Sequence, residues 1–168
     1  QKALYYLSKM RARLSKNIEP IEFVRYYSKM AELLENDDDK LRYIDSAQYV
    51  AEEHHLDNIL IHLVLLNGKM NLNSGRYKNA IVSFKLGEEK ARKFNQLDVS
   101  NQYDLYRSKA YMKLSDCERS RHYFNEFIES KYINSNSLSL ELNKLGSHIY
   151  KLCGEDKKSL LYLVEYLK

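Results

Sequence analysis

The chain of 168 residues is long enough for one domain with a sizeable buried core, and its hydrophobic share of 44% is ordinary for a globular protein. With one proline and five glycines it has little material for the turns of an all-β fold, so mostly helical structure is expected. A formal net charge of +4, with 27 basic and 23 acidic residues spread along the chain, excludes a bulk electrostatic argument for nucleic-acid or membrane binding.

No segment is expected to span a membrane. The most hydrophobic stretch, Ile59 to Leu66, is interrupted by His62 and is far shorter than the ~20 apolar residues that cross a bilayer. The chain begins at Gln1 without a methionine, which indicates a fragment excised from a longer protein. We therefore expect a cytoplasmic fragment that does not insert into a membrane, although a signal peptide, a membrane anchor or a DNA-binding domain could flank it.

Helical segments follow one another along the chain. The first, over residues 2–14, carries apolar side chains on one face, namely Ala3, Leu4, Leu7, Met10 and Leu14. We interpret residues 1–15 as the second helix of a truncated repeat. Four antiparallel helix hairpins are then predicted, at residues 20–56, 57–95, 97–133 and 136–168. The predicted architecture is an all-α, right-handed α-solenoid of about nine helices, which forms one domain over residues 1–168.

The hairpin at 57–95 reveals an internal repeat. Its first helical stretch ends at the turn Asn73-Ser74-Gly75. The second stretch has small or apolar side chains at helical spacing, at Tyr77, Ala80, Ile81, Phe84, Gly87, Ala91 and Phe94. A shift of 40 residues places Ser108 under Gly68 and Phe124 under Phe84, and the last hairpin follows after a shift of 39. Four repeats are therefore predicted.

Small side chains predict where two helices approach closely, and polar side chains predict where helices begin. Two antiparallel helices approach closely only where side chains are small. In this register the small residues are Ser28, Gly68 and Ser108 on the first helices and Ala80, Ser120 and Ser159 on the second. Ser115 and Glu118 predict a capping box, and Asp57 predicts a cap for a helix beginning near Asn58. Residues 37–39 place negative charge at the start of another helix.

Six residues of the second repeat carry a family resemblance: Gly68, Gly75, Tyr77, Ala80, Phe84 and Gly87. They resemble the small–Gly–Tyr–Ala–aromatic–small signature of the tetratricopeptide repeat, and the resemblance extends over nearly the whole chain. The period of 40 residues exceeds the ~34 usual in that family and overlaps the range of HEAT and armadillo repeats. The turn Gly75-Arg76-Tyr77 and Ala80 favour the tetratricopeptide interpretation. The long helices resemble those in repeat domains of bacterial regulatory proteins that sense peptides.

The resemblance implies a concave groove lined by the first helix of each pair. In this register Lys29, Lys69 and Lys109 take one equivalent groove position in three consecutive repeats, and His148 takes it in the fourth. The flanking groove positions hold Arg25, Tyr26, Leu65, Asn73, Tyr106, Lys113 and Lys151. A basic surface with interleaved aromatic and amide groups suits an acidic peptide or a free C-terminal carboxylate. The alternative is that these lysines form an ordinary solvated helix face.

Two functions stay open: a protein- or peptide-binding scaffold, and the sensory domain of a bacterial transcriptional or two-component regulator whose effector domain lies outside the fragment. A chaperone co-factor is not expected, because the family's carboxylate clamp has asparagine where this chain has Lys29, Lys69 and Lys109. Direct nucleic-acid binding is not expected, since there is no glycine-rich phosphate loop and no strong basic excess. An enzyme is not predicted, because no catalytic constellation is visible.

Histidines and cysteines predict no cofactor. His54, His55 and His62 do not predict a metal site, because adjacent histidines point to different faces of a helix and no familiar zinc spacing is completed. Cys117 and Cys153 belong to no paired motif, so we expect free thiols in a reducing compartment. Neither a metal nor another cofactor is therefore predicted.

The last helix keeps an apolar face up to Tyr166 and Leu167 and has no evident polar cap. A terminal repeat normally needs a polar outer face to stay soluble. Either further repeats or a second copy of the chain, in a homodimer through this helix, is expected to cover the face.

Overall fold

The computed structural model of the protein describes residues 19–130 and 136–167, and every regular element within them is an α-helix. Eight helices follow one another there: α2 (Pro20–Leu33), α3 (Asp37–Glu53), α4 (Asp57–Asn73), α5 (Tyr77–Lys93), α6 (Leu97–Lys113), α7 (Cys117–Glu129), α8 (Asn136–Leu152) and α9 (Asp156–Leu167). The helix expected within residues 1–15 lies outside the described residues. The prediction of an all-α solenoid is confirmed.

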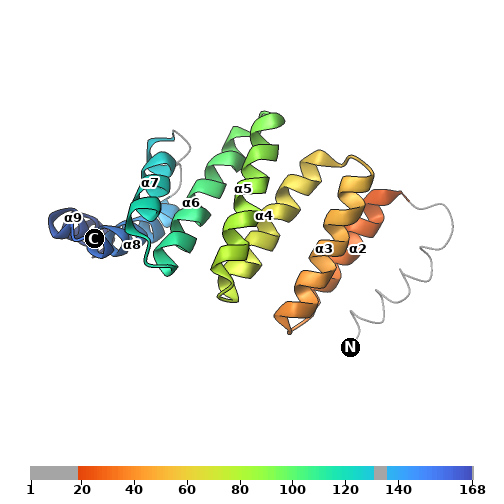
Figure 1. Ribbon diagram of the computed structural model, residues 1–168, viewed down its shortest axis with the longest axis horizontal. Coiled ribbons are helices and arrows are strands. Elements are labelled where there is room, and N and C mark those ends of the chain that lie inside the picture. Colours follow the sequence, from red (N-terminus) through yellow and green to blue (C-terminus); the bar gives the residue numbers. More distant parts are fainter. Residues whose placement is uncertain (1–18, 131–135, 168) are drawn as a thin grey trace.

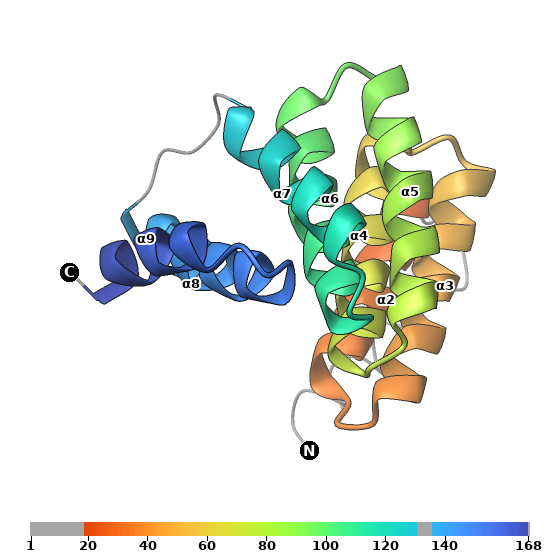
Figure 2. The same ribbon diagram turned by 60° about the vertical axis from the view of Figure 1, so that its left-hand side comes forward.

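The helices form two layers, with each helix packed against the next one in the chain (Figure 1). α2, α4 and α6 lie in one layer, and α3, α5 and α7 cover them in the other, as Figures 1 and 2 both show. Among the described helices, the backbone of α4 comes close to that of α6, and that of α6 to that of α8, whereas the backbones of α3, α5 and α7 stay farther apart. α5 reaches α3 through a side chain, because Nζ of Lys90 lies 3.3 Å from Oε1 of Glu52. The even-numbered helices therefore lie on the inner side of the solenoid. None of the described helices is both long and apolar enough to cross a membrane.

The turns between helices repeat one backbone geometry. α3, α4, α5 and α6 each contain 17 residues and end in a short turn. One residue of each turn has a φ between 54° and 75°, namely His55, Gly75, Asn95 and Ser115. The next amide donates to the carbonyl five residues earlier, as Arg76 N–H does to the Asn71 oxygen at 2.8 Å. This Schellman arrangement satisfies the last carbonyls of one helix and leads directly into the next.

The turn geometry overturns two of the predicted helix caps. Ser115 does not cap α7, because its φ of 59° makes it the left-handed residue that closes α6. Asp116 is the N-cap instead, and its carboxylate accepts the backbone N–H of Arg119 at 3.0 Å. Asp57 is already the first residue of α4, where its charge favours the helix dipole without capping a backbone amide. The acidic start of α3 at residues 37–39 is confirmed.

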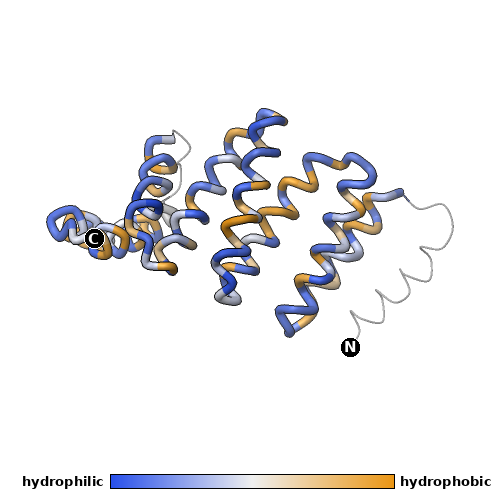
Figure 3. Tube along the Cα trace, in the orientation of Figure 1, coloured by the Kyte–Doolittle hydropathy of each residue, from blue (hydrophilic) through white to orange (hydrophobic). Residues whose placement is uncertain are grey.

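Glycines let aromatic rings enter between the helices. A methyl group added to Gly68 would overlap the ring of Phe84, and one added to Gly87 would overlap the ring of Tyr103. The Tyr103 hydroxyl also donates to the Ile61 carbonyl oxygen at 2.6 Å. This one ring therefore ties α6 to both α4 and α5. Figure 3 shows hydrophobic residues recurring along the helices between hydrophilic ones.

Serine pairs make the other close approaches. The predicted approach of Ser108 and Ser120 is confirmed, since the Ser120 hydroxyl donates to the Ser108 carbonyl oxygen at 3.0 Å. Ser159 repeats this contact by donating to the carbonyl oxygen of Ser147 at 2.9 Å. All four serines are buried, and each pair brings the two helices of one hairpin together. The hydroxyls of Ser120 and Ser159 are satisfied by these carbonyl oxygens, whereas the Ser108 hydroxyl has no partner among the described residues.

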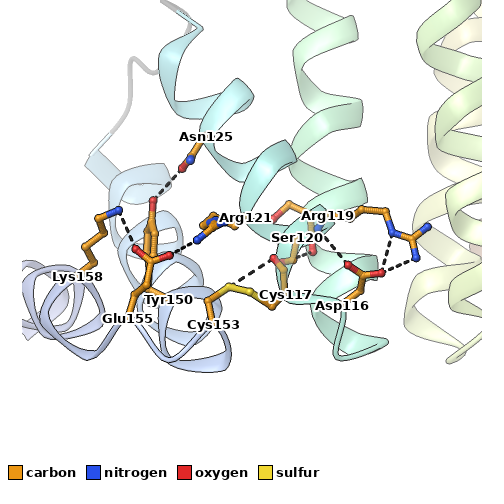
Figure 4. The surroundings of a disulfide bond; sticks show 11 residues. Asp116, Cys117, Arg119, Ser120, Arg121, Asn125, Tyr150, Cys153, Glu155 and Lys158 are labelled. Atoms are coloured by element: carbon orange, nitrogen blue, oxygen red, sulfur yellow. Dashed lines mark hydrogen bonds and ion pairs between the residues drawn. A yellow bond between two sulfur atoms is a disulfide. The ribbon is translucent and has the colours of Figure 1, made fainter.

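The two cysteines form a disulfide, which corrects the expectation of free thiols (Figure 4). Cys117 begins α7, Cys153 lies in the turn before α9, and their Cα atoms are 5.1 Å apart despite a sequence separation of 36. The repeat brings the start of one outer helix beside the turn of the next hairpin. Asp37 and Ser74 meet in the same way, with the Ser74 hydroxyl donating to the Asp37 carboxylate at 2.7 Å. The expectation of a reducing compartment was based on free thiols, and the disulfide removes that basis.

Candidate functional site

The predicted basic stripe runs along the even-numbered helices. Lys29 lies on α2, Lys69 on α4, Lys109 on α6 and His148 on α8. Lys29 and His148 are exposed, whereas Lys69 and Lys109 are half-buried. Their surroundings divide the stripe into three parts with different chemistry.

The central part is a tyrosine ring that two lysines contact. The Nζ atoms of Lys69 and Lys109 lie 4.5 Å and 5.2 Å from the ring centroid of Tyr106. The Tyr106 ring stacks on the buried ring of Phe84, with centroids 5.7 Å apart and planes 29° apart. A cation–π contact of this kind contributes about 0.5–1 kcal/mol at a partly exposed site. Because Phe84 supports the ring, α4, α5 and α6 together hold two positive charges on one surface.

A carboxylate of the chain already lies beside this central part. Oε2 of Glu141 on α8 is 3.8 Å from Nζ of Lys109, and the Glu141 side chain is 73% exposed. An exposed pair of this kind contributes about 0–1 kcal/mol, so another carboxylate can replace Glu141 at little cost. Glu141 was not among the predicted residues, because its contact with Lys109 depends on how closely α8 approaches α6.

The part of the stripe on α2 is paired within its own helix. Nη1 of Arg25 lies 2.6 Å from Oε1 of Glu22, and Nζ of Lys29 lies 2.6 Å from Oε2 of Glu32. In both pairs the two residues are three positions apart in the sequence, a spacing that brings side chains together on one face of a helix. Arg25, Tyr26 and Lys29 also line an apolar cavity of about 660 Å³ beside the start of α4. This end of the stripe therefore offers apolar volume more than free charge.

At the other end of the stripe, α8 and α9 enclose a cavity of about 510 Å³. His148 and Lys151 line it from α8, and Leu160 and Leu163 line it from α9. Asp156 also lines the cavity, which therefore combines basic and acidic side chains with an apolar wall.

The remaining predicted residues separate into exposed and buried ones. Asn73 and Lys113 are exposed at the last residues of α4 and α6. Leu65 is only 5% exposed and belongs to the core cluster that Tyr106 packs against, so its predicted place on the groove surface is corrected. The reason is that α4 and α6 approach each other on the inner side and cover it. Tyr26 is 7% exposed and packs edge-on against Tyr27, with ring centroids 5.5 Å apart.

A buried charge network between α5 and α6 lies outside the stripe. Arg107 is 6% exposed, contacts the carboxylate of Glu88, and has Nη2 at 3.2 Å from Oδ1 of Asp104. Its guanidinium also lies 4.2 Å from the ring centroid of Tyr123. Burial raises the pKa of Asp104 to about 6, although the charge of Arg92 opposes this shift. Because each charge of the network faces another side chain of the protein, we assign the network a structural role.

His54, His55 and His62 are not grouped with other potential metal ligands in the described part of the chain. His54 is the C-cap of α3, His55 has the positive φ of the following turn, and His62 is exposed on α4. Within residues 19–130 and 136–167, no three histidine, cysteine or acidic side chains are placed to share a metal ion.

α9 presents an exposed apolar face. Leu160, Leu161, Val164 and Leu167 are 58%, 68%, 52% and 73% exposed. Tyr166 is half-buried, with Nζ of Lys144 at 5.9 Å from its ring centroid. A homodimer through this helix would bury this face and stays a prediction.

Comparison with known proteins identifies the fold. No protein-family model matches the chain, and no curated protein matches it in sequence. Among solved structures, the crystal structure of BtubC (BKLC) from P. vanneervenii is similar, with a TM-score of 0.81 and 13% sequence identity. The match covers 99% of this chain and 70% of that chain. At this identity the likeness shows that the two chains share a helical-repeat-like fold.

Proposed function

We propose that the chain is a protein- or peptide-binding scaffold of the tetratricopeptide-repeat type, whose inner surface binds an acidic or carboxylate-ended segment. The observation that carries the proposal is that two lysines, Lys69 and Lys109, both lie over the ring of Tyr106. A segment that crosses from α4 to α6 meets both charges and the ring.

The central surface favours a carboxylate for two physical reasons. Hydrogen bonds between an ammonium group and a carboxylate are about twice as strong as neutral ones. Lys69 and Lys109 are already restrained by the Tyr106 ring, so binding costs them less side-chain entropy than it would cost free lysines. Glu141 supports the assignment, because its carboxylate already lies 3.8 Å from Nζ of Lys109.

The test uses a fluorescein-labelled peptide of about eight residues, rich in glutamate and ending in a free carboxylate. Fluorescence anisotropy measures its affinity for the wild-type chain and for the double variant Lys69→Glu/Lys109→Glu. We expect the double variant to bind about 10-fold more weakly or worse, since two attractive contacts become repulsive. A lysine-rich peptide of equal length should not bind the wild-type chain.

The matched control is the double variant Lys78→Glu/Lys157→Glu, which changes the net charge by the same amount. Both lysines are exposed, and both lie in the first turns of outer helices, where a negative charge is tolerated. The control should keep wild-type affinity. Equal losses in the two double variants would assign binding to net charge and refute the proposed surface. An amidated peptide then tells a terminal carboxylate from acidic side chains.

A further inference from the structure

Stacked tyrosines recur at one place in two of the hairpins. In α6–α7, Tyr111 and Tyr123 have ring centroids 5.6 Å apart and planes 9° apart. In α8–α9, Tyr150 and Tyr162 stack at 5.4 Å and 15°. Both members of the pair shift by 39 residues between the hairpins, so the two pairs are equivalent in the repeat.

The α4–α5 hairpin has no ring at this place. Asn71 and Ser83 stand 40 residues before Tyr111 and Tyr123 and are therefore their equivalents. Both residues line a cavity of about 450 Å³ that α3, α4 and α5 enclose. The cavity thus lies where the two later hairpins hold a pair of phenol rings.

The α8–α9 hairpin shows how a phenol is bound at this place. The Tyr150 hydroxyl donates to Oδ1 of Asn125, on the outer helix of the preceding hairpin, at 2.8 Å. Asn125 is equivalent to Asp45 of α3, two shifts of 40 residues earlier. Asp45 lines the cavity, and its Oδ1 already accepts Nδ2 of Asn67 at 2.7 Å. A carboxylate acceptor is therefore present where a phenol hydroxyl would reach.

A cation lies over at least one ring of each tyrosine pair. The Arg119 guanidinium is 4.7 Å from the ring centroid of Tyr111, and Nζ of Lys158 is 5.1 Å from that of Tyr150. At the cavity, Arg76 can supply the cation. It pairs with an aspartate through Nη1, whereas its Nε and Nη2 are buried and have no hydrogen-bond partner among the described residues.

We propose that the cavity between α3, α4 and α5 binds a phenolic ring, either the tyrosine side chain of a partner or a small phenol. The ring occupies the place of the stacked tyrosines against Asn71 and Ser83, and its hydroxyl donates to Asp45. The guanidinium of Arg76 covers the ring. The residues that line the cavity lie on α3, α4, α5 and the turn between α4 and α5, and none of them lies on α6. This site is therefore separate from the inner surface around Tyr106 and does not depend on the function proposed for it.

The first experiment titrates the full chain with N-acetyl-tyrosinamide and follows the side-chain amide signals of Asn67 and Asn71 by ¹H–¹⁵N NMR. We expect saturable shifts of these signals. N-acetyl-phenylalaninamide, which lacks the hydroxyl, should bind about fivefold more weakly or worse, because Asp45 then loses its hydrogen bond. Equal affinity for the two probes, or no shift up to the solubility limit, would overturn the assignment.

The second experiment fills the cavity with the rings of the later hairpins. The variant Asn71→Tyr/Ser83→Tyr should abolish binding of the tyrosine probe and keep a wild-type circular dichroism spectrum. Asp45→Leu tests the site without adding volume, and it should lower the affinity for the tyrosine probe to that for the phenylalanine probe. Asp98→Leu, at an exposed carboxylate on α6, is the control that leaves binding unchanged. Wild-type binding by Asp45→Leu contradicts the proposal even if the filled variant does not fold.

Peptides distinguish the two sources of the phenol. A peptide of about seven residues with one central tyrosine is compared with the same peptide carrying phenylalanine. If the tyrosine peptide binds about 10-fold more tightly than N-acetyl-tyrosinamide, the ring comes from a partner protein. If the two bind equally, the site takes a free phenol. If tyrosine and phenylalanine peptides bind alike, the site does not recognise a phenol and the proposal fails.

Discussion

The α5–α6 and α7–α8 junctions of the solenoid are built differently. Between α5 and α6, Tyr103 packs on Gly87 so closely that even a methyl group on the glycine would overlap its ring. The equivalent residues between α7 and α8 are Phe127 and Leu142, which are buried in one cluster. Two large residues cannot interlock as closely as a ring and a glycine. α8 and α9 run across the direction of the preceding helices, as Figure 2 shows.

The α7–α8 junction has a covalent link that the α5–α6 junction does not. The disulfide joins Cys117 to Cys153, and Arg121 forms an ion pair with Glu155 beside it (Figure 4). Nζ of Lys158 lies 2.8 Å from the same glutamate. A ring also packs on a glycine at the α7–α8 junction, since a methyl group on Gly146 would overlap the ring of Phe124. We infer that the disulfide reinforces this junction at the place where Phe127 and Leu142 replace the contact of Gly87 with Tyr103.

Removal of the disulfide is expected to have the largest effect. Cys117→Ser/Cys153→Ser should lower the free energy of unfolding by about 3–4 kcal/mol, because the bond closes a long loop with a sequence separation of 36. Urea unfolding measures the change. Hydrogen exchange should increase first in α8 and α9 and not in α4 to α6. A reducing agent should reproduce the loss in the wild-type chain and change nothing in the variant, and a uniform increase in exchange would contradict the comparison.

The reverse test breaks the α5–α6 junction. Gly87→Ala should lower the free energy of unfolding by about 2 kcal/mol, since the added methyl group overlaps the buried ring of Tyr103. This loss exceeds the ~1 kcal/mol that alanine contributes to a helix relative to glycine. Thermal unfolding measures it, with Lys85→Ala on the same helix as a neutral control. Adding Tyr103→Leu to Gly87→Ala should restore part of the loss. No loss in Gly87→Ala would show that the junction tolerates looser packing.

The difference between the two junctions also explains which features the sequence could predict. The recurrence of Gly68, Phe84, Ser108 and Ser120 at fixed spacing was sufficient to predict the paired helices, because close packing needs residues of particular sizes. The disulfide could not be predicted from spacing alone. Its two sulfur atoms meet only because the Schellman turns bring the start of α7 beside the turn before α9. The role of Ser115 in such a turn was hidden for the same reason, since serine is also a common helix cap.

The candidate site, like the disulfide, could be predicted only in part from the sequence. The repeat register placed Lys69 and Lys109 on the first helices of successive hairpins. It could not reveal that both contact the ring of Tyr106, because that depends on the distance between α4 and α6. The approach of these two helices also buries Leu65, which the register alone had placed on the surface. Distances between repeats are set by packing, and the linear spacing of residues does not contain them.

A smaller effect concerns the charge buried at the α5–α6 junction. The carboxyl of Asp104 has a pKa of about 6 in the folded chain because it is buried, whereas an aspartate in an unfolded chain has a pKa of ~3.9. The folded state therefore binds the proton more tightly, and stability decreases as the pH rises from about 4 to about 6. We expect a decrease of about 1–2 kcal/mol across this window.

The measurement compares urea unfolding of the wild-type chain and Asp104→Asn between pH 4 and pH 7. The stability of Asp104→Asn relative to the wild-type chain should increase with pH across this window, because asparagine does not titrate. Asp98→Asn, at an exposed carboxylate of the same helix, serves as the control and should follow the wild-type profile. A constant difference between the wild-type chain and Asp104→Asn would mean that the carboxyl keeps an ordinary pKa.

The smallest effect on stability is expected where the crosswise α8 reaches the inner surface. Glu141→Gln removes an exposed partner of Lys109 and should change the free energy of unfolding by less than about 0.5 kcal/mol. Affinity for the glutamate-rich peptide should nevertheless increase about two- to fivefold, because Lys109 loses an internal competitor. Glu129→Gln, at an exposed residue at the end of α7, changes the net charge equally and should leave affinity unchanged. A gain confined to Glu141→Gln would identify Lys109 as a group that the peptide contacts, and an equal gain in both variants would mean that net charge alone governs binding.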